Sequence, residues 1–156
     1  MSSEKILQKI SEKDLKENLT PEQYEEYLEN DKVEKLDDAK PYIKQDFLSF
    51  VQYVWPDFIE GSHHKIINKK FNDLAQGKIK RLIINMPPRH TKSEFASYLL
   101  PAWMIGKNPK LKIIQATHTA DLAIDFGRKT KNLVDEEKYR ELFDTRLQED
   151  SQAAGK

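Results

Sequence analysis

The spacing of apolar side chains predicts helices over the first half of the chain. From Pro41 onward, apolar residues recur three or four positions apart, as they do along one face of a helix. They are Ile43, Phe47, Phe50, Val51 and Val54. Trp55-Pro56 should end this helix, because proline disfavours helical backbone at the preceding residue. A second helix should follow, with Ser62 as its N-cap and Gly77 just beyond its C-terminus.

The first forty residues are polar and predict only short helices. Thr20-Pro21-Glu22-Gln23 is a capping-box pattern with proline at the first helical position, so a helix should begin at Pro21. It should end near Asn30, and the acidic stretch through Asp38 should form a linker or a loosely docked arm. Residues 1–40 carry seven Lys and twelve Asp or Glu, whereas the remainder carries nineteen basic and fourteen acidic residues. We therefore expect an acidic helical arm over 1–40 and a separate domain over 41–156, where an anionic ligand would bind.

Short apolar runs replace helical spacing in the second half of the chain. Arg81–Met86 and Lys112–Thr117 each have the composition of a buried parallel strand. Helices should follow them, from Lys92 to Ile105 with a kink at Pro101, and from Thr119 to Val134. This order of strand, helix, strand and helix predicts an open α/β fold with a parallel sheet and right-handed crossovers.

Composition excludes several classes of protein. The absence of cysteine excludes disulfides and thiolate metal sites, and favours an intracellular setting. No apolar run approaches the roughly 20 residues that span a bilayer. The N-terminal residues lack the apolar stretch of a secretory signal. We expect a protein that is neither secreted nor embedded in a membrane.

The segment with the clearest chemistry lies between the first predicted strand and the helix after it. Its sequence is Met86-Pro-Pro-Arg-His-Thr-Lys-Ser93. A loop in this position aims main-chain N–H groups and a helix N-terminus at phosphate oxygens. Lys92 would neutralise the β- and γ-phosphates, and Ser93 would place its hydroxyl on Mg²⁺. Met86 and Thr91 occupy both glycine positions of the phosphate-loop pattern, and threonine resists a positive φ. The alternative is an ordinary turn with a surface lysine.

The run from Arg81 to Glu94 resembles the deviant Walker A segment of phage terminase large subunits, the ATPases of DNA-packaging motors. The similarity covers about residues 41–156. Its other matching segments are Phe47, Trp55-Pro56, His63-His64, Gly77 to Arg81, Ala116 to Thr119, Leu122-Ala123, Phe126 to Arg128 and Asp150 to Lys156. The resemblance implies the N-terminal part of a P-loop ATPase domain, with an incomplete parallel sheet flanked by helices and with ATP and Mg²⁺ as ligands. It also implies translocation of double-stranded viral DNA into the procapsid, in the host cytoplasm, with the terminase small subunit, the portal protein and further copies of the full-length chain as partners.

The resemblance assigns roles to single residues of the loop. Lys92 corresponds to the lysine that binds the β- and γ-phosphates, and Ser93 to the Mg²⁺ ligand. Arg89 corresponds to an arginine that stabilises the γ-phosphate, and it could equally form an ion pair with Glu94. The remaining residues of the predicted cradle are Pro88, His90 and Thr91.

Two further positions carry open alternatives. The resemblance places His63 and His64 near the adenine ring, whereas an exposed start of a helix is the simpler explanation. A metal site is not expected there, because adjacent helical residues point apart. His118 and Thr119 would face DNA or a coupling loop according to the resemblance. The alternative is a helix N-cap by Thr117 or Thr119.

A phosphate-loop ATPase also needs an acidic strand end, and none follows Ser93. Asp121 and Asp125 fall on a predicted helix, so no carboxylate is placed to hold Mg²⁺ or polarise water. We therefore expect a fragment that binds nucleotide and does not hydrolyse it alone. The alternatives are another P-loop ATPase such as a helicase, against which the glycine-free loop argues, and a non-catalytic nucleotide- or partner-binding remnant that uses residues 1–40.

Overall fold

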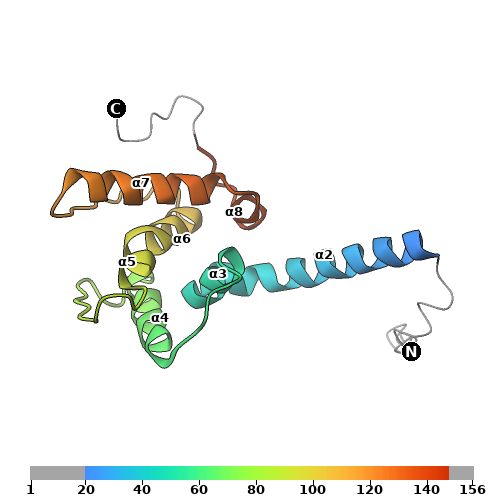
Figure 1. The fold of residues 1–156 in the computed structure, drawn as a ribbon, viewed down its shortest axis with the longest axis horizontal. Coiled ribbons are helices and arrows are strands. Elements are labelled where there is room, and N and C mark those ends of the chain that lie inside the picture. Colours follow the sequence, from blue (N-terminus) through green and yellow to red (C-terminus); the bar gives the residue numbers. More distant parts are fainter. Residues whose placement is uncertain (1–19, 148–156) are drawn as a thin grey trace. The chain divides into compact units, whose positions relative to one another are not determined.

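The computed structural model describes residues 20–147, and every regular element in that range is helical (Figure 1). In chain order the elements are α2 (Pro21–Gln45), α3 (Phe47–Val54), α4 (Ser62–Ala75), α5 (Lys92–Glu94), η2 (Phe95–Leu99), α6 (Leu100–Lys107), α7 (Ala120–Asp135) and α8 (Glu137–Leu142). The chain divides into two compact units, residues 1–40 and 41–156, and α2 runs from the first into the second. Within the described range, no helix has the length and apolar character needed to cross a membrane.

The expected parallel sheet is absent from residues 20–147, so the prediction of an α/β fold with an incomplete phosphate-loop sheet is wrong. The two predicted strands, residues 81–86 and 112–117, have no regular structure. Their apolar side chains are largely exposed, Ile83 to 86% and Ile114 to 96%. Apolar composition alone does not make a strand, because a strand needs a neighbour that completes its main-chain hydrogen bonds. Neither segment makes such bonds with any other part of residues 20–147.

Helix α2 begins as predicted but continues through the predicted linker. Thr20 Oγ1 accepts a hydrogen bond from the Gln23 N–H (3.3 Å), and the Gln23 side chain accepts one from the Thr20 N–H (3.0 Å). These two bonds confirm the capping box. The predicted end near Asn30 is wrong, and residues 31–38 are helical rather than a linker. Charges of opposite sign lie one helical turn apart there, as in the pair of Asp31 and Lys35 (2.6 Å), and support the helix.

A polar cluster joins the start of α3 to α4. Asp46 caps α3 by accepting a hydrogen bond from the Ser49 N–H at 2.9 Å. Its other carboxylate oxygen accepts bonds from the side-chain amides of Asn68 (2.8 Å) and Asn72 (2.6 Å). Burial alone would raise the pKa of Asp46, but these hydrogen bonds to the charged form outweigh it and the pKa is lowered. The charged cap therefore fixes where α3 begins against α4.

Aromatic rings from four helical elements form the core of the second unit. Phe47 on α3 is fully buried. The rings of Phe71, Phe95 and Trp103 meet it edge-on, at centroid distances of 5.1, 5.3 and 5.7 Å. Edge-to-face packing of this kind is favourable because the positive ring edge meets the negative face.

Of the apolar face predicted after Pro41, Ile43, Phe47, Phe50 and Val51 are buried, whereas Val54 is half-buried. The prediction of a single helix starting at Pro41 is wrong, because Pro41 lies inside α2 and Asp46 separates α2 from α3.

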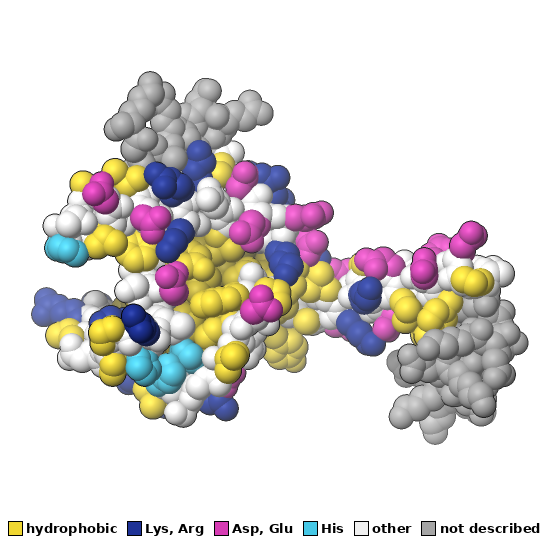
Figure 2. Space-filling model, viewed as in Figure 1, with side chains coloured by type: hydrophobic (Ala, Val, Ile, Leu, Met, Phe, Trp, Pro, Cys, Tyr) yellow, Lys and Arg dark blue, Asp and Glu magenta, His cyan; other side chains and the backbone are white. Residues whose placement is uncertain are grey.

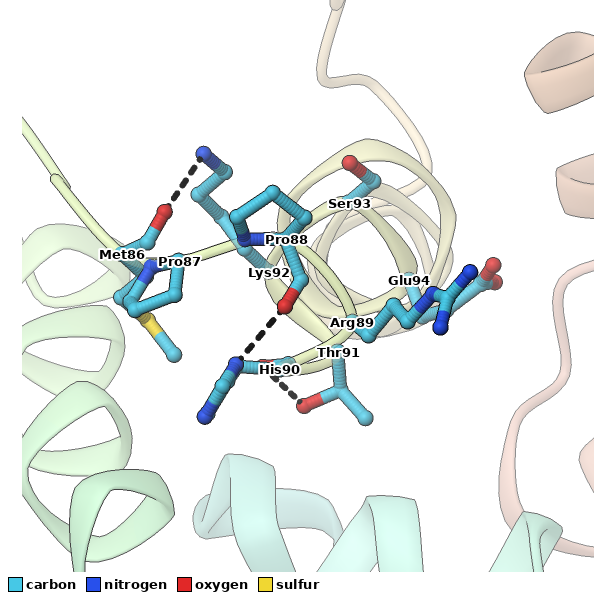
Figure 3. A pocket seen from close by; sticks show the side chains of 9 residues that line it. All are labelled: Met86, Pro87, Pro88, Arg89, His90, Thr91, Lys92, Ser93 and Glu94. Atoms are coloured by element: carbon cyan, nitrogen blue, oxygen red, sulfur yellow. Dashed lines mark hydrogen bonds between the residues drawn. The ribbon is translucent and has the colours of Figure 1, made fainter.

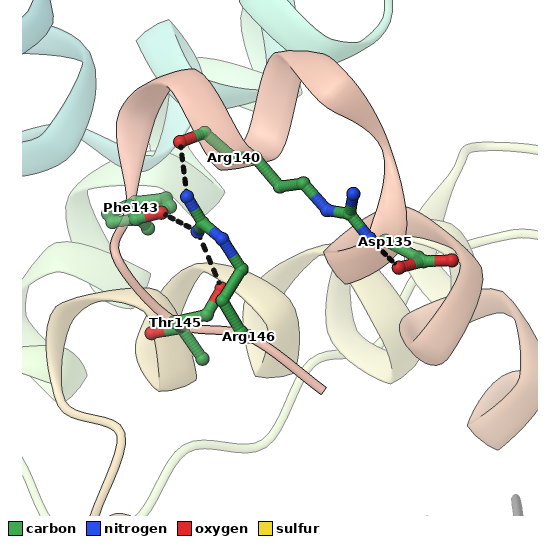
Figure 4. Close-up of polar contacts among 5 residues, drawn as sticks. All are labelled: Asp135, Arg140, Phe143, Thr145 and Arg146. Carbon is green, nitrogen blue, oxygen red and sulfur yellow. Dashed lines mark hydrogen bonds and ion pairs between the residues drawn. The ribbon is translucent and has the colours of Figure 1, made fainter. Parts of the chain in front are cut away.

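The last two helices close this unit, α7 against η2 and α6, and α8 against α3 and α7. Arg146 satisfies carbonyl groups at the end of α8 (Figure 4). Its guanidinium donates to the carbonyls of Phe143 (2.6 Å), Thr145 (3.0 Å) and Arg140 (3.3 Å). The Arg140 side chain itself forms an ion pair with Asp135. A helix of only six residues leaves most of its end carbonyls without a helical donor, and Arg146 supplies one.

The helical segment that begins at Lys92 changes its winding before Pro101. The Leu100 N–H donates to the carbonyl of Phe95, five residues earlier, so η2 is a π-helical turn. Proline has no N–H, and in a regular α-helix its ring clashes with the carbonyl four positions before it. The wider turn accommodates Pro101, and the predicted irregularity at this proline takes the form of a π turn.

Candidate phosphate-binding loop

The loop between residues 86 and 94 surrounds a cavity of about 450 Å³ (Figure 3). The residues that line it are Met86, Pro87, Pro88, Arg89, His90, Thr91, Lys92, Ser93 and Glu94. All the loop residues that the sequence marks for phosphate binding therefore line one cavity. It lies where the helical segment α5–η2–α6 begins.

Two residues of this loop have left-handed backbone conformations although neither is glycine. Arg89 has a φ of 64°, and Thr91 has a φ of 57° with a ψ of 6°. A positive φ is uncommon for any residue with a side chain and is strained for a β-branched one. Strain of this kind concentrates at functional sites. Thr91 thus adopts the conformation that glycine would favour at this position of the pattern.

Side-chain hydrogen bonds hold the loop in this conformation. His64 Nε2 lies 2.7 Å from Thr91 Oγ1, and the Thr91 hydroxyl donates to the His90 carbonyl at 2.7 Å. The other ring nitrogen of His64, Nδ1, accepts a bond from the Gly61 N–H at 2.8 Å. His90 Nδ1 donates to the Pro88 carbonyl at 2.8 Å (Figure 3). The loop is therefore tied both to itself and to the start of α4.

His64 is buried among aromatic rings. Only 4% of its surface is exposed. The rings of Phe58 and Phe95 lie 4.7 and 5.0 Å from it, centroid to centroid, and that of His63 lies 3.8 Å away. Burial lowers the pKa of His64, and the neighbouring His63 ring lowers it further. A neutral ring agrees with an Nδ1 atom that accepts a hydrogen bond.

The two cations of the loop have no carboxylate partner within the described part of the chain. Lys92 Nζ donates to the Met86 carbonyl at 3.3 Å. Arg89 has neither an ion pair nor a hydrogen bond there, and is exposed. The alternative pairing of Arg89 with Glu94 is not formed, because Glu94 Oε1 lies 3.6 Å from Lys129 Nζ instead. Both positive groups are therefore available to an anion.

His63 lies beside the loop and lines a second cavity. Its ring is 5.6 Å from that of His90, and Figure 2 shows histidine side chains (cyan) gathered next to basic side chains on this face. The second cavity, of about 360 Å³, lies between α4 and residues 82–86. His63 Nε2 is buried and has no hydrogen-bond partner among the described residues. Contact of His63 or His64 with a nucleotide base stays a prediction.

The second histidine-containing segment lies apart from this cavity. His118 is exposed and is not among the residues that line the loop cavity. Thr119 Oγ1 accepts a hydrogen bond from the Leu122 N–H at 3.4 Å at the start of α7. The interpretation of Thr119 as a helix cap is confirmed, while the cap of α4 is Gly61 rather than the predicted Ser62.

The residues that support the loop from behind could be predicted only in part. Gly61, Phe58 and Phe95 hold His64 in place, and His64 in turn contacts Thr91. The spacing of Gly61 and His64 is that of a capping box, in which the side chain three residues after the cap bonds back to the cap N–H. That half of the arrangement was accessible from the sequence. The contact between His64 and Thr91 was not, because it joins residues 27 positions apart.

Protein-family models, curated proteins and solved structures were each compared with the chain, and none of them matches it. The geometry of the loop and the resemblance of residues 81–94 are therefore the grounds for assigning a function.

Proposed function

We propose that the loop Pro87–Ser93 binds the phosphate groups of ATP with Mg²⁺, and that the chain is the N-terminal part of a phage terminase large subunit. One observation carries this proposal. Two residues with side chains, Arg89 and Thr91, are held at positive φ around a cavity whose two cations, Arg89 and Lys92, have no carboxylate partner among residues 20–147. Backbone strain is typical of functional sites, and the uncompensated positive charge favours an anion as the ligand.

The main chain at Thr91 and Lys92 supports an anion ligand. A left-handed residue followed by a right-handed one turns successive N–H groups toward a common point, and such concavities bind anions. The first helical hydrogen bond of the segment runs from the Phe95 N–H to the Thr91 carbonyl, at 2.9 Å. The N–H groups of Lys92, Ser93 and Glu94 therefore have no helical acceptor and are free to donate to phosphate oxygens.

The charged side chains suit a triphosphate in particular. Lys92 Nζ donates only to a neutral carbonyl, at 3.3 Å, and would gain by exchanging it for a charged phosphate oxygen. Arg89 would reach the same group with its planar guanidinium and stabilise charge that develops on the γ-phosphate. These two roles are the ones that the resemblance to terminases implies.

Mg²⁺ fits this loop only as an ion that accompanies the phosphates. The described residues contain no group of three His, Cys, Asp or Glu side chains able to hold a metal ion. Ser93 is exposed at the cavity and would provide one hydroxyl ligand. Mg²⁺ commonly takes its remaining ligands from water and phosphate oxygens. When bound, the ion would neutralise charge on the β- and γ-phosphates.

The proposal extends to the setting of the whole motor. It assigns to the full-length protein the ATP-driven translocation of double-stranded viral DNA in the host cytoplasm. The partners would be the terminase small subunit, the portal protein and further copies of the full-length chain. Turnover by residues 1–156 alone is not part of the proposal, because the sequence offers no acidic strand end.

Substitution of the loop lysine tests the proposal. We expect Lys92→Ala to weaken binding of a fluorescent ATP analogue in the presence of Mg²⁺ by at least about tenfold, because a charge-assisted hydrogen bond is lost. Fluorescence titration gives the dissociation constants. Lys110→Ala is the control, since Lys110 is an exposed lysine that does not line the cavity. Equal binding by wild type and Lys92→Ala would overturn the proposal.

A further inference from the structure

The loop has an unusual threonine that needs an explanation. Thr91 has a φ of 57° and stands directly before the lysine, where phosphate loops have glycine. Glycine adopts this conformation freely, because it has no Cβ atom to meet the neighbouring carbonyl. Threonine has branches at Cβ and resists it. Some other interaction must therefore hold the backbone of Thr91 in place.

The hydrogen bonds around Thr91 have only one possible direction. The Gly61 N–H donates to His64 Nδ1 at 2.8 Å, so Nδ1 carries no proton. The proton of the neutral ring is then on Nε2, which donates to Thr91 Oγ1 at 2.7 Å. The Thr91 hydroxyl keeps its own hydrogen for the His90 carbonyl, also at 2.7 Å. Three consecutive bonds thus lead from the cap of α4 to the main chain of the loop.

The side chains around His64 hold its ring in the orientation that these three hydrogen bonds require. The ring is 4% exposed and packs between Phe58 and Phe95. These contacts restrict rotation of the His64 ring. They also leave little room for water to take the place of His64 as the hydrogen-bond partner of Thr91. Hydrogen bonds that polarise one another in such a setting are stronger than isolated ones.

We propose that His64 is a positioning residue for the phosphate loop, and that its bond to Thr91 replaces the conformational freedom that glycine has at this position. The proposal rests on the function proposed for the loop. His64 does not touch the phosphates in this scheme. It acts through Thr91, whose left-handed backbone aims the N–H groups of Lys92 and Ser93 into the cavity.

A merely structural role for His64 makes a different prediction. If His64 only fills space between Phe58 and Phe95, its loss should matter equally whichever residue occupies position 91. If it holds a strained threonine, its loss should matter little once position 91 is glycine. The combination of His64→Phe with Thr91→Gly separates the two cases, because phenylalanine keeps a ring in the aromatic site and removes the hydrogen bonds.

Binding of the fluorescent ATP analogue with Mg²⁺ is the first readout. We expect His64→Phe to raise the dissociation constant about tenfold in the Thr91 protein, and less than about twofold in the Thr91→Gly protein. Equal fold-changes in both proteins would overturn the positioning role. If His64→Phe does not fold, Thr91→Val and Thr91→Ser replace it. The valine variant, which lacks the hydroxyl, should then bind more weakly than the serine variant, and equal binding would overturn the role.

Urea unfolding without nucleotide separates failure of this inference from failure of the proposed function. Non-additive effects of His64→Phe and Thr91→Gly on the free energy of unfolding would show that His64 sets the loop conformation. Additive effects would overturn that statement. In a further outcome, the wild-type protein binds no nucleotide while the effects of the two substitutions on the free energy of unfolding are non-additive. The proposed phosphate binding would then be wrong, and only the conclusion that His64 sets the conformation of Thr91 would stand.

Discussion

At the scale of single residues, His64 has to remain uncharged for its hydrogen bonds to persist. A proton on Nδ1 would remove the acceptor of the Gly61 N–H. Burial lowers the pKa of His64 from the ordinary value of 6.5, and nearby His63 and His90 lower it further, while Glu60 partly opposes them. In the unfolded chain the same residue titrates at its ordinary value. The unfolded state therefore binds a proton at a higher pH than the folded state does.

This difference predicts a loss of stability in mild acid. As the pH falls below about 6.5, the unfolded chain gains a proton at His64 and the folded protein does not, so the free energy of unfolding decreases. The decrease from this residue stops once the pH is below the lowered pKa of the folded state. Urea unfolding between pH 8 and pH 5 measures it.

Two variants test whether His64 is the source of this pH dependence. His64→Phe should show a flatter dependence than wild type over this range, because the titrating ring is gone. His118→Gln should keep the wild-type dependence, since His118 is exposed. An unchanged slope in His64→Phe would show that other groups cause the loss.

At the scale of the helices, two glycines occupy opposite kinds of environment. A Cβ atom on Gly106, in α6, would lie 2.6 Å from the Phe143 ring, which is itself only 4% exposed. That ring packs against Tyr139 and Phe50 at 4.9 and 5.9 Å between centroids, so it has little room to move. A Cβ atom on Gly127, in α7, would meet nothing within 4 Å. Gly106 therefore allows close packing against Phe143, whereas Gly127 only weakens α7.

Alanine at these two positions should change stability in opposite directions. We expect Gly106→Ala to lower the free energy of unfolding by about 1–3 kcal/mol, through overpacking against Phe143. Gly127→Ala should raise it by about 0.5–1 kcal/mol, because alanine favours a helix more than glycine does. Chemical unfolding of both variants measures the difference. A gain in stability for Gly106→Ala would mean that the end of α8 is not packed on α6 as described.

At the scale of the whole molecule, the second unit leaves two apolar segments uncovered. Ile83 and Ile114 are 86% and 96% exposed, and both lie in runs that favour β-structure. An exposed segment with free main-chain groups invites pairing with another chain. These segments therefore contribute little to the stability of the fold while they promote association.

Polar substitution in these segments should separate association from stability. We expect Ile83→Asn and Ile114→Asn to reduce concentration-dependent association in sedimentation velocity experiments. The free energy of unfolding should change by less than about 0.5 kcal/mol, as for most surface substitutions. Ile67→Asn is the contrasting control, because Ile67 is 7% exposed and its substitution should destabilise the fold. Association that is equally strong in all the proteins would argue against these segments as its origin.

Local signals in the sequence were sufficient for some helix boundaries but not for the end of α2, the cap of α4 or the sheet. The capping box at Thr20 and the stop before Pro56 depend on neighbouring residues, and both are confirmed. Gly77, with a φ of 72°, ends α4 as predicted. Strands at 81–86 and 112–117 required partners elsewhere in the chain, which apolar composition cannot specify. The same limit hides the bond between His64 and Thr91, so the loop could be located from the sequence while its support could not.

The π turn at Phe95–Leu99 also sets the phase of the helix that leaves the loop. An α-helix advances by about 100° for each residue. A π turn absorbs one additional residue, so everything after it is rotated by about that angle relative to the same sequence wound as a regular α-helix. Lys92 and Ser93 face the cavity on one side of the turn, whereas Trp103 enters the aromatic core on the other. Deleting a single residue between 95 and 99 would restore a regular helix and keep Trp103 facing Phe47, whereas winding the same residues as a regular α-helix would turn Trp103 away. The π turn thus keeps the loop and the core aligned, and rewinding residues 95–99 as a regular α-helix would change their relative rotation without changing the sequence.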